Sequence, residues 1–123
     1  MPYTIEDARA AVAKGAALLD EKKPGWREEM DWKDCDITMP CDCVLGQCFA
    51  PPKGRGWGSY NRGLDFLCPP PADEHHLDMV QRRTRFAVEY GFDVPRSESG
   101  TAGSYMILQR AWEEESGFVV IER

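Results

Sequence analysis

The sequence predicts a compact, single all-α domain of about five helices. Three observations favour this class: apolar residues recur at helical spacing in several segments, cap and stop residues bracket those segments, and the one β-prone run, residues 118–121, has no strand to pair with. A chain of 123 residues is long enough to bury a core without disulfide or metal support. We therefore expect one domain over residues 1–123, with a short C-terminal β segment left open.

The first helix is expected to begin after Thr4, because Asp7 stands three residues later and completes a variant of the capping box. Lys23-Pro24-Gly25 should end it, and Pro24 can open a short helical turn that reaches about Met30 and carries Trp26. The buried face of the first helix is outlined by apolar and small residues at helical spacing: Ile5, Ala8, Val12, Gly15, Ala16 and Leu19.

The middle of the chain alternates short helical segments with loops. Residues 31–38 are predicted to form a turn, and Met39-Pro40 to mark a new start. The segment from Cys43 to Phe49 is predicted to be a core helix, packed by the first, fourth and last helices. Gly46 costs such a helix about 1 kcal/mol relative to alanine, so it predicts close contact with a neighbouring backbone. A Gly/Pro-rich loop at 51–58 follows, and then a helix from Ser59 to about Leu67.

The second half predicts two more helices. One runs between Ala72 and Tyr90 and ends at Gly91, which suits a left-handed C-terminal position. Its apolar side comprises Met79, Val80, Phe86, Ala87 and Tyr90. Its polar side should carry i,i+4 ion pairs between Asp78 and Arg82 and between Arg85 and Glu89. After a Ser/Gly-rich loop at 96–103, a last helix closed by Gly117 is outlined by Tyr105, Leu108, Ala111 and Trp112.

Charge and composition exclude several classes of function. The net charge is −6, and residues 63–123 carry six Lys and Arg against eleven Asp and Glu. Such a surface should repel nucleic acid, and it fits either a basic partner or simple solubility. No run approaches the roughly 20 apolar residues of a membrane-spanning helix, and the N-terminus lacks the pattern of a secretory signal. We therefore expect a cytoplasmic protein with no membrane or nucleic-acid partner and with reduced thiols.

Four of the five cysteines fall within the fourteen residues from Cys35 to Cys48. Zinc needs four converging ligands, but in a helix Cys41 and Cys48 would lie about 10 Å apart along the axis, and Cys43 would point to the opposite side. The favoured interpretation is a buried apolar stripe of Cys41, Val44, Leu45 and Cys48, with no metal or other cofactor. A metal-binding or redox-responsive cysteine module stays open as the alternative, with Cys41 or Cys43 as a thiolate at the helix start.

The loop before Ser59 carries the residues most suited to contact a partner. Arg55, Trp57 and Tyr60 combine a positive charge with aromatic side chains, which often anchor protein interfaces. The other interpretation is that Trp57 and Tyr60 fold back onto the core. No catalytic motif is present, and a dyad of Cys43 with His75 or His76 could arise only through folding.

Several short segments, in order along most of the chain, resemble a group of small uncharacterised proteins of actinobacteria and their bacteriophages. They are Gly15-Ala-Ala-Leu-Leu-Asp20, Pro24-Gly25-Trp26, Cys43-Val-Leu-Gly-Gln47, Gly63-Leu64, Gly91-Phe92-Asp93, and Tyr105 with Leu108 and Trp112. The resemblance implies a shared single-domain fold and a phage or actinobacterial origin, but no activity. It also implies that Cys43 is a structural position, and that the other cysteines are peculiar to this chain.

The sequence therefore predicts a small, acidic, non-enzymatic protein-interaction domain, and the resemblance implies that a phage encodes it and that it acts on a host protein. The C-terminal apolar tail could pair across a homodimer. The partner-binding candidates are Arg55, Trp57 and Tyr60. The predicted structural positions are Cys43, Leu45, Gly46, Gln47, Gly91 and Trp112.

Overall fold

The computed structural model describes residues 3–39, 42–49, 59–95 and 102–117. Within these ranges the chain is all-α, as predicted, and contains no strand. The β-prone tail, Pro40, Cys41, the predicted loop at 51–58 and residues 96–101 of the loop predicted at 96–103 lie outside the described residues. The helices are α1 (Ile5–Lys22), α2 (Trp26–Glu29), α3 (Val44–Cys48), α4 (Ser59–Leu67), α5 (His76–Glu89) and α6 (Ala102–Ser116).

Helix α1 begins with the capping box that the sequence predicts. The Thr4 hydroxyl accepts a hydrogen bond from the Asp7 amide at 3.1 Å, and the Asp7 carboxylate accepts one from the Thr4 amide at 3.1 Å. After Lys22, Gly25 adopts a left-handed φ of 86° and precedes α2. Pro24 therefore does not open the second helix, because the left-handed glycine after it separates the two helices.

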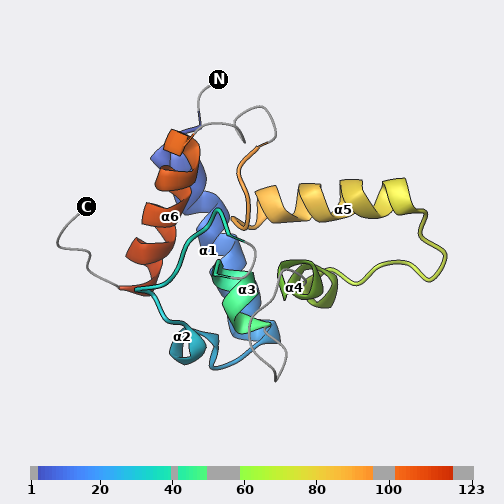
Figure 1. Cartoon of the computed structure of the whole chain (residues 1–123), viewed down its shortest axis with the longest axis horizontal. Helices are drawn as coiled ribbons and strands as arrows, with labels where there is room; N and C mark the ends of the chain where they lie inside the picture. The colour runs from blue at the N-terminus through green and yellow to red at the C-terminus, as the bar shows by residue number, and fades with distance from the viewer. Residues whose placement is uncertain (1–2, 40–41, 50–58, 96–101, 118–123) are drawn as a thin grey trace.

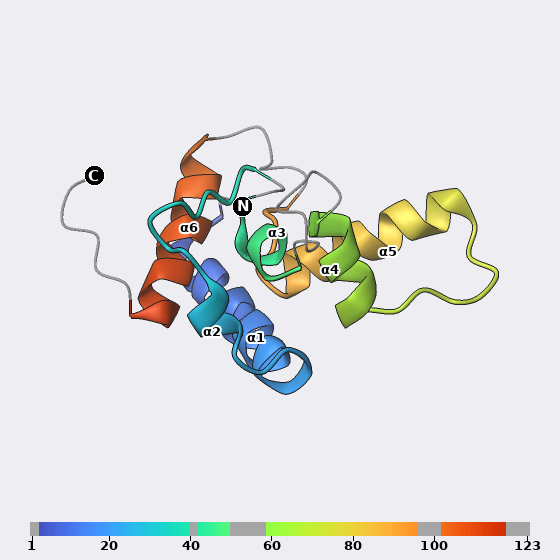
Figure 2. The ribbon, with the colours of Figure 1, turned by 60° about the horizontal axis from the view of Figure 1, so that its bottom comes forward.

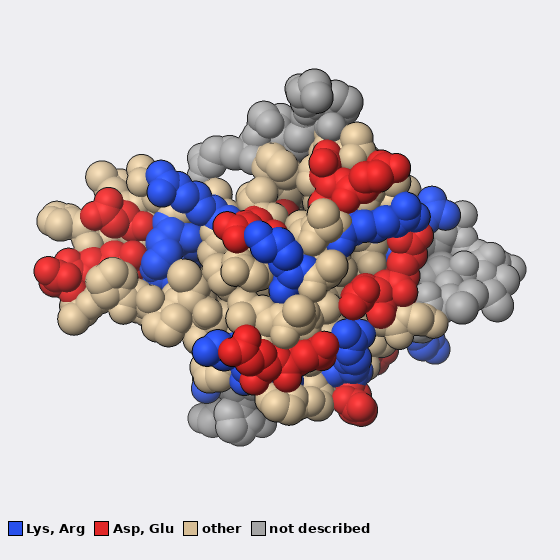
Figure 3. Space-filling model, turned by 180° about the vertical axis from the view of Figure 1, so that it is seen from behind, with Lys and Arg blue, Asp and Glu red and all other residues tan. Residues whose placement is uncertain are grey.

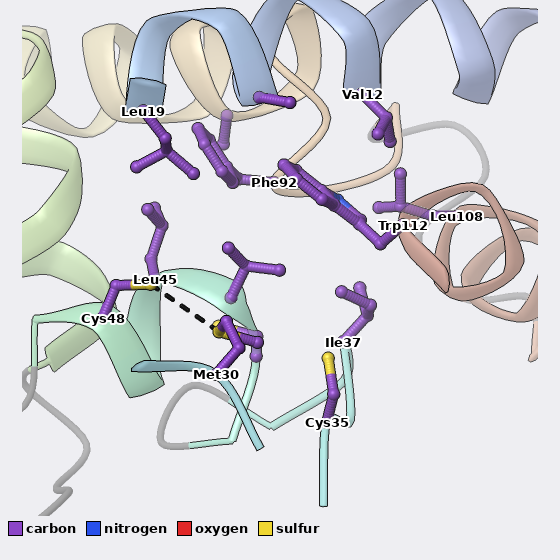
Figure 4. Close-up of a cluster of buried hydrophobic side chains, with 14 of the residues drawn as sticks. Val12, Leu19, Met30, Cys35, Ile37, Leu45, Cys48, Phe92, Leu108 and Trp112 are labelled. Carbon is purple, nitrogen blue, oxygen red and sulfur yellow. Dashed lines mark hydrogen bonds between the residues drawn. The ribbon is translucent and has the colours of Figure 1, made fainter. Parts of the chain in front are cut away.

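Helices α1 and α6 lie side by side and form the largest helix pair of the domain (Figure 1). Their buried faces join residues from α2, α3, α4 and the segment after α5 in a single core (Figure 4). Trp112 of α6 is fully buried at its centre. Its ring stacks on Phe92 with centroids 5.6 Å apart and meets Trp26 edge-on at 5.9 Å.

The turn after α5 packs into a notch in α1. Gly91 has a φ of 77°, and a Cβ there would lie 2.9 Å from the backbone nitrogen of Val12. A Cβ on Gly15 would overlap the carbonyl oxygen of Tyr90. The Trp112 indole donates a hydrogen bond to the Gly91 carbonyl at 2.6 Å. Two glycines and one tryptophan therefore hold α1, α5 and α6 together.

Helix α3 is shorter and starts later than predicted. Cys43 is its N-cap, and the Cys43 thiol sulfur accepts a hydrogen bond from the Gly46 amide at 3.4 Å. The helix packs against α4 and α2, while its side chains enter the core that α1 and α6 line. At the α3–α4 contact Gly63 makes a close approach, because a Cβ there would lie 2.7 Å from the Phe49 ring.

Helix α5 differs most from its prediction. It begins at His76 and not near Ala72, and residues 72 and 73 form a turn after the prolines. Of its predicted apolar side only Ala87 is buried. The expected pairing of Asp78 with Arg82 and of Arg85 with Glu89 was wrong, because Arg82 and Glu89 bind partners from other elements instead.

Arg82 joins α5 to α4 and to the connection between them. Its guanidinium donates to Glu74 at 2.9 Å, to Asp65 at 2.8 Å and to the Cys68 carbonyl at 2.6 Å. Arg83 binds the same Asp65 at 2.6 Å, and hydrogen bonding first to Arg83 and then to Arg82 lowers the pKa of the Asp65 carboxyl. Two turns further along α5, at the last residue of the helix, Glu89 pairs with Lys14 of α1 at 2.7 Å.

Helix α6 starts at Ala102, before the predicted loop ends, so Gly103 and Ser104 are helical. It is closed as predicted at Gly117, which has a φ of 77°. Arg9 of α1 and Glu114 of α6 add a two-point ion pair on the surface, with an Nε–Oε1 distance of 2.9 Å.

We predict that Gly15→Ala lowers the free energy of unfolding by about 3 kcal/mol, because the new methyl group must displace the backbone of Tyr90. Urea denaturation monitored by tryptophan fluorescence measures the change. Gly103→Ala is the matched control, since a Cβ there meets no atom within 4 Å and alanine favours a helix. If both variants lowered the free energy of unfolding equally, the close approach of α5 to α1 would be contradicted.

We also predict that Arg82→Lys costs about 2 kcal/mol, because an ammonium group cannot serve Glu74, Asp65 and the Cys68 carbonyl together. The control is Arg62→Lys in α4, an exposed position, which should change the free energy of unfolding by less than about 0.5 kcal/mol. If Arg82→Lys is as stable as this control, the network does not hold α5.

Candidate functional site

Two buried glutamines hold the irregular segment between α2 and α3. Gln47 of α3 pairs with the backbone of Asp31: its amide oxygen accepts from the Asp31 N–H at 2.7 Å, and its amide nitrogen donates to the Asp31 carbonyl at 3.1 Å. The same nitrogen donates to the carbonyl of Asp42 at 2.9 Å. Both ends of the segment are thus tied to one side chain of α3.

Gln109 of α6 binds the middle of that segment in the same way. Its amide oxygen accepts from the Ile37 N–H at 2.9 Å, and its amide nitrogen donates to the Cys35 carbonyl at 2.7 Å. The nitrogen also lies 3.3 Å from a carboxylate oxygen of Glu113. Because peptide groups that are buried need partners, these bonds determine how closely the segment approaches α6.

An open groove of about 1410 Å³ lies between this segment and α6. Figures 1 and 2 show the segment running alongside α6. We call this hollow the α6 groove. It is lined by Lys33, Asp34, Cys35, Asp36, Ile37, Thr38, Asp42, Gly103, Tyr105, Met106, Ile107, Gln109, Arg110, Glu113, Glu114 and Gly117.

The α6 groove combines an apolar surface with an acidic lining. Met106 is 69% exposed and is flanked in sequence by the half-buried Tyr105 and Ile107. Five lining residues carry carboxylates and two are cationic, although Glu114 is already paired with Arg9. The volume exceeds that of typical small-molecule pockets, which hold about 300–1,000 Å³. Its size, exposure and charge suit an extended or helical segment of another protein.

The residues predicted to bind a partner do not form a site in the described structure. Arg55 and Trp57 lie outside the described residues. Tyr60 is half-buried against the core and its hydroxyl donates to the Phe92 carbonyl at 3.4 Å; burial raises the pKa of this phenol. Tyr60 thus matches the interpretation in which it folds back onto the core.

The predicted structural residues all lie in the interior. Trp112 and Gly91 form the junction of three helices, and Gln47 is the side chain that ties the segment before α3. The buried members are Cys43, Leu45, Gly46, Gln47, Gly91 and Trp112.

Three thiols contribute to the core. Cys35, Cys43 and Cys48 are buried, and Cys68 is half-buried. Burial raises the pKa of Cys35 and of Cys48 to about 12. The Cys48 thiol donates to the Met30 sulfur at 3.6 Å (Figure 4). Cys43, which was expected on the side of a helix opposite Cys41 and Cys48, is the N-cap of α3 and is buried in the core.

The sequence also left open chemistry by cysteine and histidine side chains. Among the described residues, no three His, Cys, Asp or Glu side chains gather where they could hold a metal ion. His75 and His76 are exposed at the start of α5, whereas Cys43 is buried at the start of α3. Seen from behind, basic and acidic side chains intermingle over the surface (Figure 3).

Sequence reasoning missed the residues of the α6 groove. The position of Met106 could have indicated an exposed apolar residue. It is large and apolar, but it does not share the helical face of Tyr105, Leu108 and Trp112. Gln109 gave none, because its role depends on a segment about 70 residues away in the chain.

No protein-family model, curated protein or solved structure matches this chain. None of the described helices is both long enough and apolar enough to cross a membrane.

We predict that Cys35 and Cys48 react with iodoacetamide at pH 8 at least about 100-fold more slowly in the folded protein than in urea, because the thiolate is the reactive form and burial disfavours it. Site-resolved mass spectrometry measures each rate. Cys68, which is half-buried, serves as the internal comparison and should react faster than both. Labelling of Cys35 or Cys48 as fast in the folded protein as in urea would contradict the burial of these thiols.

Proposed function

We propose that this chain is a non-enzymatic protein-interaction domain that binds a basic, amphipathic segment of a partner protein in the α6 groove. The observation that carries the proposal is the exposed Met106 within a groove lined by five carboxylates and two cations. A bound segment would cover Met106 with apolar side chains and place Lys or Arg beside the acidic lining.

The rigidity of the groove supports this role. Gln109 and Gln47 hold the segment that forms one wall, and α1 supports the other wall through its packing against α6. A wall that is ordered before binding reduces the entropy lost on association. The resemblance to small phage and actinobacterial proteins extends the proposal to a phage-encoded protein that acts on a host protein, and this extension rests on the resemblance alone.

A displayed library of random 16-residue peptides tests the proposal. Enriched peptides should combine Lys or Arg with aliphatic or aromatic residues at helical or alternating spacing. Fluorescence anisotropy with synthetic copies should show affinity that falls as salt rises, because exposed complementary charges are screened. Enrichment of acidic peptides, or no enrichment at all, would overturn the proposal.

We predict that Met106→Glu weakens binding of an enriched peptide at least about tenfold, because it places another carboxylate where the apolar contact forms. The matched control is Leu77→Glu on α5, which changes an equally exposed apolar residue, 73% against 69%, outside the groove. If both variants bind as the unmodified protein does, the peptide site is elsewhere.

A further inference from the structure

The outer face of α5 carries an exposed apolar surface. Leu77 is 73% exposed and Val80 is 39% exposed. They line a shallow hollow together with Gln81, Thr84 and Arg85. The start of α5 extends away from the α1–α6 pair (Figures 1 and 2).

The rest of the domain holds α5 through two arginines and through the C-terminal end of the helix. Arg82 and Arg83 bind Asp65 of α4, and Ala87 is buried near the C-terminal end of the helix. These attachments orient α5 while Leu77 and Val80 remain exposed to solvent. No described element covers that face.

Because Arg82 and Glu89 form ion pairs with other elements, the side chains of Asp78 and Arg85 beside this face lack their expected helical partners. Glu74 and Asp65 bind Arg82, and Lys14 binds Glu89, so neither Arg82 nor Glu89 is available to its helical neighbour. Within the described part of the chain, Asp78 and Arg85 are exposed and make no ion pair. They stand seven residues apart, two turns along one flank of α5, separated by about 10 Å.

We infer that α5 pairs antiparallel with α5 of a second copy of this chain. A two-fold axis passing between Gln81 and Arg82 places Asp78 of each copy opposite Arg85 of the other, so two ion pairs form. The same axis brings Leu77 of one copy toward Thr84 of the other and sets the two Val80 side chains close to the axis. Because Asp78 and Arg85 lie at equal distances from the axis, the acid of each copy faces the base of the other.

The contact is small, since it involves one helix of 14 residues from each copy. Interfaces of this size are typical of weak association. The dimer should therefore form at high protein concentration, and it would present two α6 grooves. The inference does not depend on what the α6 groove binds.

Sedimentation equilibrium of the full chain under reducing conditions, from about 10 μM to about 1 mM, tests the pairing. The weight-average mass should rise from 13.9 kDa toward twice that value. Leu77→Glu should keep the protein monomeric, and Met106→Glu should associate like the unmodified chain. A chain that stays monomeric throughout, or a dimer that Met106→Glu disrupts and Leu77→Glu does not, would overturn the inference.

Charge reversal tests the register. Asp78→Arg alone and Arg85→Asp alone each create two like-charge contacts per dimer, and each should raise the dissociation constant about tenfold. The double variant D78R/R85D restores both contacts with the charges exchanged and should recover most of the affinity. Circular dichroism confirms that each variant is folded. If the double variant loses as much free energy of dimerisation as the two single variants together, Asp78 and Arg85 do not contact each other in the dimer.

Discussion

The packing of the Tyr90–Gly91 turn against α1 determines the positions of three helices at once. Gly15 removes the side chain that would overlap Tyr90, and Gly91 adopts the left-handed conformation that lets the backbone reach Val12. The indole of Trp112 then donates to the Gly91 carbonyl from α6. Because a buried carbonyl needs this partner and the close approach needs glycine, α1, α5 and α6 can assemble in few other ways. The aromatic stack of Trp112 on Phe92 and Trp26 extends the same junction to α2.

Side-chain amides then organise what the helices leave irregular. Gln47 and Gln109 act as substitutes for a neighbouring strand, since each offers an acceptor and a donor to the peptide groups of the segment before α3. Arg82 does the equivalent for the connection before α5. In each case one buried or half-buried polar side chain binds several groups at once. The two surfaces proposed to bind other proteins, the α6 groove and the outer face of α5, lie beside these polar supports.

Much of the fold could be predicted because its signals are local. The capping box at Thr4, the stop after Lys22, the glycines after α5 and α6, and the burial of Leu45 and Trp112 follow from spacing and residue type. The candidate site could not, because the α6 groove needs Ile37 and Gln109 to meet across the fold. The ion pairs of α5 were mispredicted for the same reason: exposed i,i+4 pairs contribute little, so tertiary carboxylates such as Asp65 and Glu74 compete successfully for Arg82.

The sequence by itself determined that this is an all-α domain, where most of its helices run, and most of the core residues of α1, α3 and α6, because helical periodicity, caps and breakers act within a few residues. Only the tertiary structure decided which helices touch and which charges pair, and that Met106 and Leu77 stay exposed. Those outcomes depend on whether a notch such as that at Gly15 lies opposite a turn such as that at Gly91. No local pattern encodes such a meeting, since its free energy arises only when both surfaces are already folded.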